Sequence, residues 1–450
     1  MVGFHSLIAG GKALLLTDLD LIKQIYIKDF DHFLHMRLGG RKFDLGHKYL
    51  NNMLFVMEED AWRETRHASS PIFTSGKLKK MSKIMHKVAM DLVGHLRKLA
   101  SSGEEVNARD LASKFTMTII ANAGFGIDAN CFEDSPRSEQ FSQMALKFTG
   151  ANRPSWEVAR FFFASMLPKF LGKIVGGSIV EEDALKFFES IIDQRLNMKK
   201  TKKADDMVDI ITDTLRVDAT KDAGNHEDDS KQEVLAPIGE DKVELLLKSN
   251  LFAMFFAGME PPSGMMAACL FFLARNQDVQ ERLYEEINEA NLDEKLDYNT
   301  FMNFEYLDMV VQETMRHNAI VDPQRTCSKD YQVPGTNFTI PKGMSVFISA
   351  YGIMMDERYF ENATKFNPEH FNPKNKEKRN PGTDLGFGFG ARKCIGSRLA
   401  LLQWKTGIAF TVQKFKILPT TRLPDKLVLD PKSGNTQVKG GIWIRFEERG

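Results

Sequence analysis

The stretch from Leu251 to Ala274 constrains the fold most, because its twenty-four residues carry a single charge, Glu260. A run of this length and hydropathy could cross a membrane as a helix. The central Glu260-Pro261-Pro262 sequence argues against contact with lipid, because an ionisable group and two residues without a backbone N–H suit a kink that lines a protein site. We therefore predict a buried helical segment beside a functional site.

A glycine-rich loop, Leu385–Gly396, precedes an amphipathic segment at 397–410 and contains Cys394. Free N–H groups near the start of a helix lower the pKa of a thiol and so favour the thiolate that a metal ion binds. Glycines lack a Cβ and let a flat cofactor approach the backbone. Arg392 offers a fork of donors suited to a carboxylate on such a cofactor. Cys394 is therefore a candidate metal ligand.

Two other interpretations of this loop are weaker. Most lone cysteines are inert buried residues, which would leave Cys394 without a role. Gly386, Gly388 and Gly390 could belong to a nucleotide-binding loop, but the third glycine of Gly-x-Gly-x-x-Gly is missing and no βαβ unit surrounds them.

The loop resembles the haem-binding loop of the cytochrome P450 family. The family pattern Phe-x-x-Gly-x-Arg-x-Cys-x-Gly is matched by Phe387, Gly390, Arg392, Cys394 and Gly396. The resemblance extends over nearly the whole chain from Gly3. It implies one domain spanning residues 1–450, mainly α with a small antiparallel β portion, and haem b bound through Cys394.

Composition sets further limits on function. The 60 basic and 60 acidic residues cancel, so no global field favours nucleic acid, and none is expected as a partner. The four cysteines form no Cys-x-x-Cys pair or zinc spacing, which favours a reducing compartment. Met1–Gly11 lacks the basic region and apolar core of a signal peptide. In the resembling family a membrane-anchoring helix precedes this point, so we expect a truncated form or an incomplete gene model.

The resemblance also assigns residues that contact the cofactor. Trp62 and Arg66 lie four residues apart and match a Trp-x-x-x-Arg pair that the family uses on a haem propionate, although spacing alone favours an ordinary amphipathic helix. Arg325 matches an arginine that reaches the second propionate, and Arg392 is expected to bind a carboxylate of the same cofactor. The remaining positions expected at the cofactor are Ala257, Phe387, Gly388 and Gly396.

The segment around Glu260 resembles the distal helix of the family, in which Ala-Gly-x-Asp/Glu-Thr-Thr relays protons to bound dioxygen. Ala257, Gly258 and Glu260 match, but Pro261 and Pro262 replace both threonines. This is the largest departure from the family pattern. We expect Glu260, and then Ser263, to be the catalytic proton donors, with waters held by the carbonyls that the prolines leave without helical partners. The alternative is that the prolines only kink the helix and so shape the pocket.

Glu313 and Arg316 lie three apart on a predicted amphipathic helix from Phe304 to His317. Glu-x-x-Arg alone most often means a surface ion pair. The distance of Glu313 from Cys394 matches the structural triad of the family, but His370 stands where the family has an arginine. Imidazole lacks the bidentate fork, so we expect a weaker clamp.

Other segments are predicted more coarsely. Residues 12–16, 331–333, 338–340 and 345–349 are expected to be strands, and the tail from Leu427 to Glu447 a hairpin lining the cavity. The charge-rich segment 199–241 is predicted to be a mobile surface loop. The apolar patch at 161–170 is either core or, by resemblance, in contact with a bilayer.

The chain from Ser70 to Lys79 is similar to the microsomal, xenobiotic-metabolising branch of the family, which implies a location on the cytosolic face of the endoplasmic reticulum membrane. The first hypothesis is a monomeric monooxygenase of a small lipophilic substrate, with electrons from NADPH through a flavoprotein reductase and with cytochrome b5 as a second partner. The reductase is expected to dock on a basic cluster that consists of Lys77, Lys79, Lys80, Lys83 and Lys87. The alternatives are a haem-thiolate isomerase or dehydratase of an oxygenated lipid and a non-catalytic haem or ligand carrier.

Overall fold

The structure is a computed structural model of the 450-residue chain. It describes residues 1–6, 11–38, 41–42, 45–133, 135–149, 180–199, 240–290, 298–319, 322–430 and 437–450, and isolated positions between 156 and 212. The segments at 161–170 and 199–241 fall largely outside the described residues, so their predicted roles stay predictions.

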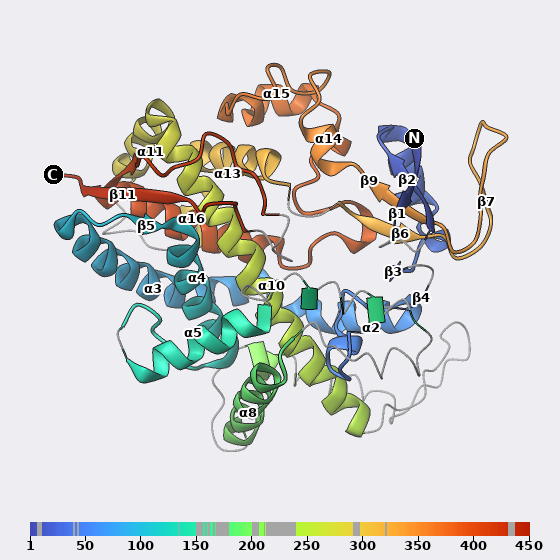
Figure 1. Ribbon diagram of the computed structural model, residues 1–450, viewed down its shortest axis with the longest axis horizontal. Helices are drawn as coiled ribbons and strands as arrows, with labels where there is room; N and C mark the ends of the chain where they lie inside the picture. The colour runs from blue at the N-terminus through green and yellow to red at the C-terminus, as the bar shows by residue number, and fades with distance from the viewer. Residues whose placement is uncertain are drawn as a thin grey trace.

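Helices make up most of the described chain, which confirms the mainly α fold (Figure 1). The α-helices are α1 (Leu19–Lys23), α2 (Glu59–Ser69), α3 (Ser75–Ser102), α4 (Ala108–Ile119), α5 (Pro136–Thr149), α8 (Glu182–Lys199), α10 (Glu240–Arg275), α11 (Gln277–Glu289), α12 (Tyr298–Asn303), α13 (Glu305–His317), α14 (Ala350–Met354), α15 (Pro373–Lys378) and α16 (Ser397–Lys414). Short 3-10 or π segments are η1 (Gln24–Lys28), η2 (Phe30–His32), η3 (Leu50–Asn52), η4 (Ser70–Phe73), η5 (Ile120–Gly124), η6 (Pro368–Phe371), η7 (Pro381–Thr383) and η8 (Gly390–Arg392).

The β portion is small and lies at two ends of the molecule (Figure 1). The strands are β1 (Val2–Ser6), β2 (Gly11–Leu16), β3 (Arg37–Leu38), β4 (Arg41–Lys42), β5 (Val106–Asn107), β6 (Gln324–Thr326), β7 (Tyr331–Gln332), β8 (Thr339–Ile340), β9 (Ser345–Ile348), β10 (Phe415–Pro419) and β11 (Trp443–Glu448). One sheet has the order β1-β2-β9-β6 and another β10-β11-β5. The pairing is antiparallel as predicted, except that β2 and β9 run parallel, with Ala13 opposite Ser345.

Helix α10 crosses the middle of the molecule and packs against α4, α13 and α16 (Figure 1). Its apolar stretch is buried because it has neighbours on most sides, as expected for a helix that is hydrophobic all round. Pro261 and Pro262 lie inside the helix and do not end it. No helix in the described part of the chain has the length and hydropathy needed to cross a bilayer. The expectation that 251–274 is apolar enough to do so was therefore wrong.

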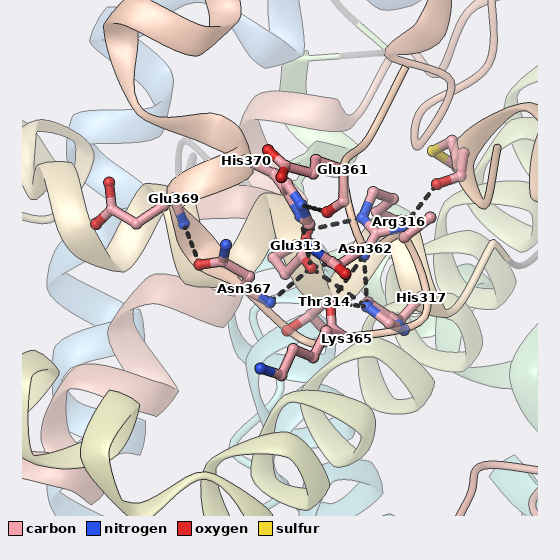
Figure 2. Close-up of polar contacts among 12 residues, drawn as sticks. Glu313, Thr314, Arg316, His317, Glu361, Asn362, Lys365, Asn367, Glu369 and His370 are labelled. Carbon is pink, nitrogen blue, oxygen red and sulfur yellow. Dashed lines mark hydrogen bonds and ion pairs between the residues drawn. The ribbon is translucent and has the colours of Figure 1, made fainter. Parts of the chain in front are cut away.

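A buried polar cluster joins α13 to the segment before the cysteine loop, centred on Glu313 (Figure 2). Arg316 donates to both carboxylate oxygens, from Nε at 2.8 Å and from Nη2 at 2.7 Å, and the backbone N–H of Asn367 donates at 2.8 Å. His370 and His317 each place a ring nitrogen 3.2 Å from Oε1. Glu313 and Arg316 are completely buried, so the surface-pair alternative does not apply.

His370 takes part in this cluster through a different geometry from an arginine fork. Its Nδ1 lies 3.2 and 3.3 Å from the two Glu313 oxygens, and its Nε2 lies 2.7 Å from the carbonyl oxygen of Glu361. Both ring nitrogens therefore face acceptors, and only the protonated ring donates to both. The contacts to Glu313 are longer than those of Arg316, in line with the weaker clamp that we predict.

Candidate haem-thiolate site

One cavity of about 430 Å³ lies between α10 and the cysteine loop and is bordered by α2 and β6. Its walls are mostly apolar. Every residue that we predict at the cofactor, and the predicted metal ligand, borders this cavity: Trp62, Arg66, Ala257, Arg325, Phe387, Gly388, Arg392, Cys394 and Gly396. Four segments far apart in the sequence thus converge on one site.

The cysteine loop is folded as a tight turn against the N-terminal part of the chain. The backbone N–H of Cys394 donates to the carbonyl of Phe387 at 2.9 Å, and Gly388 and Gly390 have φ values of +78° and +75°. A Cβ at Gly390 would lie 2.1 Å from the carbonyl oxygen of Tyr26. Only glycine fits here, because the conformation is left-handed and the neighbouring backbone leaves no room.

The electrostatics of Cys394 differ from our prediction. Burial raises the pKa of the Cys394 thiol, while the backbone N–H of Gly396 and the charge of Arg66 lower it by less. Neighbouring protein atoms thus disfavour the charged form, although Cys394 is itself exposed to the cavity, and the thiolate stays a prediction. A cation bound to the sulfur would supply the missing stabilisation.

Three arginines face the cavity and find only backbone carbonyls as acceptors among the described residues. Arg66 donates to Lys393 at 2.9 Å, Arg325 to Gln324 at 2.5 Å and Arg392 to Met57 at 2.8 Å. Nε of Arg325 and Nε of Arg392 are buried and have no hydrogen-bond partner in the described part of the chain.

These guanidinium groups are electrostatically uncompensated. Burial, and then the positive charge of Arg325, lowers the pKa of Arg392 to about 9. Burial likewise lowers the pKa of Arg325 and of Arg66. Buried charges are normally paired, so the cavity calls for an anionic ligand. The two carboxylates of haem would pair with these arginines, and its iron would meet the Cys394 sulfur, so the residues fit this group.

Trp62 is buried at the edge of the same cavity and packs against two of the cations. The guanidinium carbon of Arg392 lies 4.3 Å from the ring centroid and that of Arg66 lies 5.7 Å away. Such contacts hold the planar groups in place without neutralising them. Phe387 stacks on Trp404 of α16, with centroids 5.6 Å apart and an interplanar angle of 10°.

The α10 wall of the cavity is formed by one face of the helix: Ala257, Gly258, Pro261, Pro262 and Met265. These positions recur at the spacing of a helical face. Glu260 and Ser263 lie off that face and do not line the cavity. The helical period already places Glu260 and Ser263 on a different face from Ala257 and Pro261, so the sequence contained this information.

The structure therefore does not place the two predicted proton donors where that role needs them. Glu260 is buried and forms an ion pair with Arg109 of α4. The hydroxyl of Ser263 is buried and donates to the carbonyl of Glu260 at 2.9 Å. Both groups are held in contacts with protein, and the tail at 427–447 contributes no described residue to the cavity either.

Sequence reasoning also missed several residues of the site. Arg109 had no recognisable motif, and its pairing follows only from the packing of α4 on α10. Gln403 and Trp404 border the cavity from α16, and their buried side-chain nitrogens have no partner in the described part of the chain. Both residues belong to the helix that follows Cys394, and the amphipathic pattern of that segment is visible in the sequence. Their position beside the cysteine loop could therefore have been predicted.

The fold and the site thus define a haem-thiolate protein. The family model "Cytochrome P450" matches residues 6–439. Similar curated proteins are cytochrome P450 6B7 of Helicoverpa armigera, with 31% identity over 97% of this chain and 83% of that protein, and probable cytochrome P450 9f2 of Drosophila melanogaster, with 32% identity over 97% and 84%. Cytochrome P450 9e2 of Blattella germanica is 30% identical over 97% of this chain and 84% of its own length. The chain belongs to the cytochrome P450 family.

Membership of this family makes the protein an oxidoreductase of the P450 monooxygenase type that binds haem. Members of the family in general use redox partners and lipophilic substrates. The cavity agrees with a lipophilic substrate, because its wall is mostly apolar.

Proposed function

We propose that the chain is a haem b monooxygenase that inserts one oxygen atom from dioxygen into a small lipophilic substrate. The observation that supports this most is the convergence of Cys394, Arg66, Arg325 and Arg392 on one apolar cavity. When bound, haem supplies the redox chemistry by which dioxygen is activated.

The residues of the chain perform the binding and orientation. Cys394 is the protein ligand to iron, and the glycine-framed loop allows close approach of a flat group to its backbone. Arg325 and Arg392 orient the cofactor through its carboxylates, and Arg66 adds a third cation beside Trp62. The apolar face of α10 and the side chains opposite it exclude water and hold the substrate by burial of its surface.

Electrons would come from NADPH through a flavoprotein reductase, with cytochrome b5 as a second donor. A basic cluster on α3 supports this docking: Lys79, Lys80, Lys83 and Lys87 are exposed and Lys77 is half-buried. The cluster follows Phe73 in the sequence, and the side chain of Phe73 lies beside Gly396 of the cysteine loop. A Cβ added to Gly396 would lie 3.5 Å from the Phe73 ring. An acidic partner docked there would lie close to the cysteine loop. We place the enzyme, as a monomer, on the cytosolic face of the endoplasmic reticulum membrane.

A second candidate reaction is the isomerisation or dehydration of an already oxygenated lipid, which needs no external electrons. The wall of α10 favours it, because proline stands where a hydroxyl would be needed and Glu260 is engaged by Arg109. A proton relay from these residues to the cavity is therefore lacking among the described side chains.

The test is a carbon-monoxide difference spectrum of the reduced, haem-loaded protein. Thiolate ligation gives a red-shifted band, and Cys394→Ser should abolish it, because a serine hydroxyl is a far poorer ligand for iron. Cys131→Ser, at a buried cysteine outside the cavity, should leave the band unchanged. An unaltered spectrum of Cys394→Ser would refute the ligand assignment.

The two reactions are distinguished by their electron demand. Reductase-dependent consumption of NADPH with formation of an oxygenated product supports the monooxygenase. Turnover of a lipid hydroperoxide without reductase, and no NADPH-dependent product when reductase is present, would replace the monooxygenase with the isomerase or dehydratase.

A further inference from the structure

Two consecutive prolines remove backbone donors from the cavity wall. In an α-helix the N–H of residue i+4 donates to the carbonyl of residue i, and proline has no N–H. Pro261 therefore cannot donate to Ala257, and Pro262 cannot donate to Gly258, although α10 continues through both. Gly258 also loses the i+3 donor, because that residue is Pro261. Ala257 keeps an i+3 donor at Glu260.

The residues that carry these carbonyls belong to the lining of the cavity. Ala257 is exposed and Gly258 is half-buried, whereas the next two residues, Met259 and Glu260, are buried. Since the helix passes through the core, this exposure is exposure to the cavity that both residues line. Gly258 has no side chain, so the surface that it contributes is its backbone.

Side chains that reach this turn of α10 bind other carbonyls. Thr116 of α4 donates to the carbonyl of Met259 at 3.2 Å, and Ser263 donates to that of Glu260 at 2.9 Å. No described side chain donates to the carbonyl of Ala257 or Gly258. The carbonyl of Gly258, which has neither an i+3 nor an i+4 donor, is thus left to whatever occupies the cavity, while that of Ala257 keeps its i+3 partner.

Helix α4 holds this turn in place from the opposite side. Arg109 forms an ion pair with Glu260, and Thr116 binds the carbonyl of Met259. Gly258 packs so closely on Ile120 that a Cβ there would lie 2.4 Å from Cδ1 of that side chain. The two carbonyls are therefore presented by a rigid part of the wall, which lowers the entropic cost of binding a ligand to them.

We propose that the carbonyls of Ala257 and Gly258 form an acceptor subsite that binds a hydroxyl or N–H group of the substrate. The other α10 side chains that border the cavity are apolar except Asn250, whose amide donates to the carbonyl of Leu246 at 2.8 Å. The preferred substrate class is then a compact lipophilic skeleton that carries one hydrogen-bond donor. A site with a fixed polar group discriminates more strongly against an analogue that lacks the partner than an apolar wall does. The proposal rests on the proposed function only in taking this cavity as the substrate pocket.

The test compares binding of a donor and a non-donor ligand on the same skeleton. Dissociation constants of 2-adamantanol and 2-methoxyadamantane are measured by titration calorimetry with the haem-loaded protein, without reductase or turnover. The wild type should bind the alcohol about twofold to tenfold more tightly than the ether, the usual net effect of one hydrogen bond. Pro262→Ala gives Gly258 its helical donor back and should bring this ratio close to one.

Two further variants make the comparison specific. Pro261→Ala should also lower the ratio, because it restores a donor to Ala257. Pro373→Ala replaces an exposed proline at the start of α15, outside the cavity lining, and should leave the ratio unchanged. Alanine is the best helix former, so the α10 variants should fold.

The proposal is overturned by either of two results. A wild-type ratio near one means that the alcohol gains nothing from the wall, as when water holds both carbonyls. A high ratio that persists in both Pro261→Ala and Pro262→Ala places the acceptor elsewhere. Because the measurement needs no catalysis, failure of the monooxygenase assignment leaves its result unaffected, and a normal turnover with a ratio of one refutes the subsite alone.

Discussion

Replacing Glu313 by glutamine should destabilise the fold strongly, although the change keeps the shape of the side chain. The carboxylate is completely buried and accepts hydrogen bonds from Nε and Nη2 of Arg316, which is also completely buried. Glu313→Gln leaves that guanidinium without its counter-ion. Breaking a buried pair by removing one partner costs about 3 to 5 kcal/mol, because an uncompensated buried charge remains.

The variant should also lose a pH dependence that the wild type has. Burial raises the pKa of Glu313, but hydrogen bonds from Arg316, His317 and His370 outweigh burial and hold that pKa well below its ordinary value. A carboxyl group with a lowered pKa in the folded state stabilises the protein fully above its unfolded pKa of about 4.3. The contribution decreases as the pH falls below that value. The wild-type and variant stabilities should therefore converge in acid.

The measurement is urea unfolding of the haem-loaded protein, followed by far-UV circular dichroism at pH 7.5 and in a series down to pH 3.5. Glu182→Gln is the matched control, because the exposed Glu182 pairs with the exposed Lys186 at positions i and i+4 of α8, and the unfolding midpoint of this variant should equal that of the wild type. A loss below about 1 kcal/mol at pH 7.5 for Glu313→Gln would show that Arg316 is compensated in another way.

Two further substitutions test the site. Arg392→Ala should weaken haem retention about tenfold or more, because one charge-assisted hydrogen bond to a buried carboxylate is lost. The haem dissociation rate measures this, with Arg358→Ala as a control at an exposed position. Equal dissociation rates of the two variants would contradict the prediction. Gly390→Ala should lower the melting temperature clearly more than Gly335→Ala, because both glycines have φ near +75° but only the first would bring a Cβ within 2.1 Å of a neighbouring carbonyl oxygen. Equal melting temperatures would mean that the loop moves away from Tyr26 freely.

Local sequence was sufficient for those parts of the site that depend on a short segment. The glycine loop identified Cys394, and the family positions identified Arg325 and Arg392, all of which border the cavity. The apolar length of 251–274 predicted the buried helix that forms the opposite wall. In each case a short, continuous segment of sequence contains the pattern on which the prediction depends.

Other features depend on which neighbour packs against a residue. The motif around Glu260 indicated a proton donor, but the side chain turns toward Arg109 because α4 covers that face of α10. The pKa of Cys394 was expected to be low from its position before a helix, but burial by separate segments has the larger effect. The parallel pairing of β2 with β9 joins residues more than 300 positions apart, and no local pattern specifies it.

The parallel contact between β2 and β9 has a consequence for synthesis of the chain. β1 and β2 are synthesised more than 300 residues before β9, the strand that covers the other edge of β2. Tyr26 similarly donates to the carbonyls of Pro323 and Val346, at 2.7 and 3.2 Å. The β1-β2 hairpin therefore has an unpaired edge until β9 has been made. Unpaired strand edges promote association between chains. The carbonyl of Tyr26 also abuts Gly390, so the cysteine loop packs against a segment that is itself hydrogen-bonded to β9. Cofactor capture is therefore expected late in synthesis, after both β9 and the cysteine loop have been made.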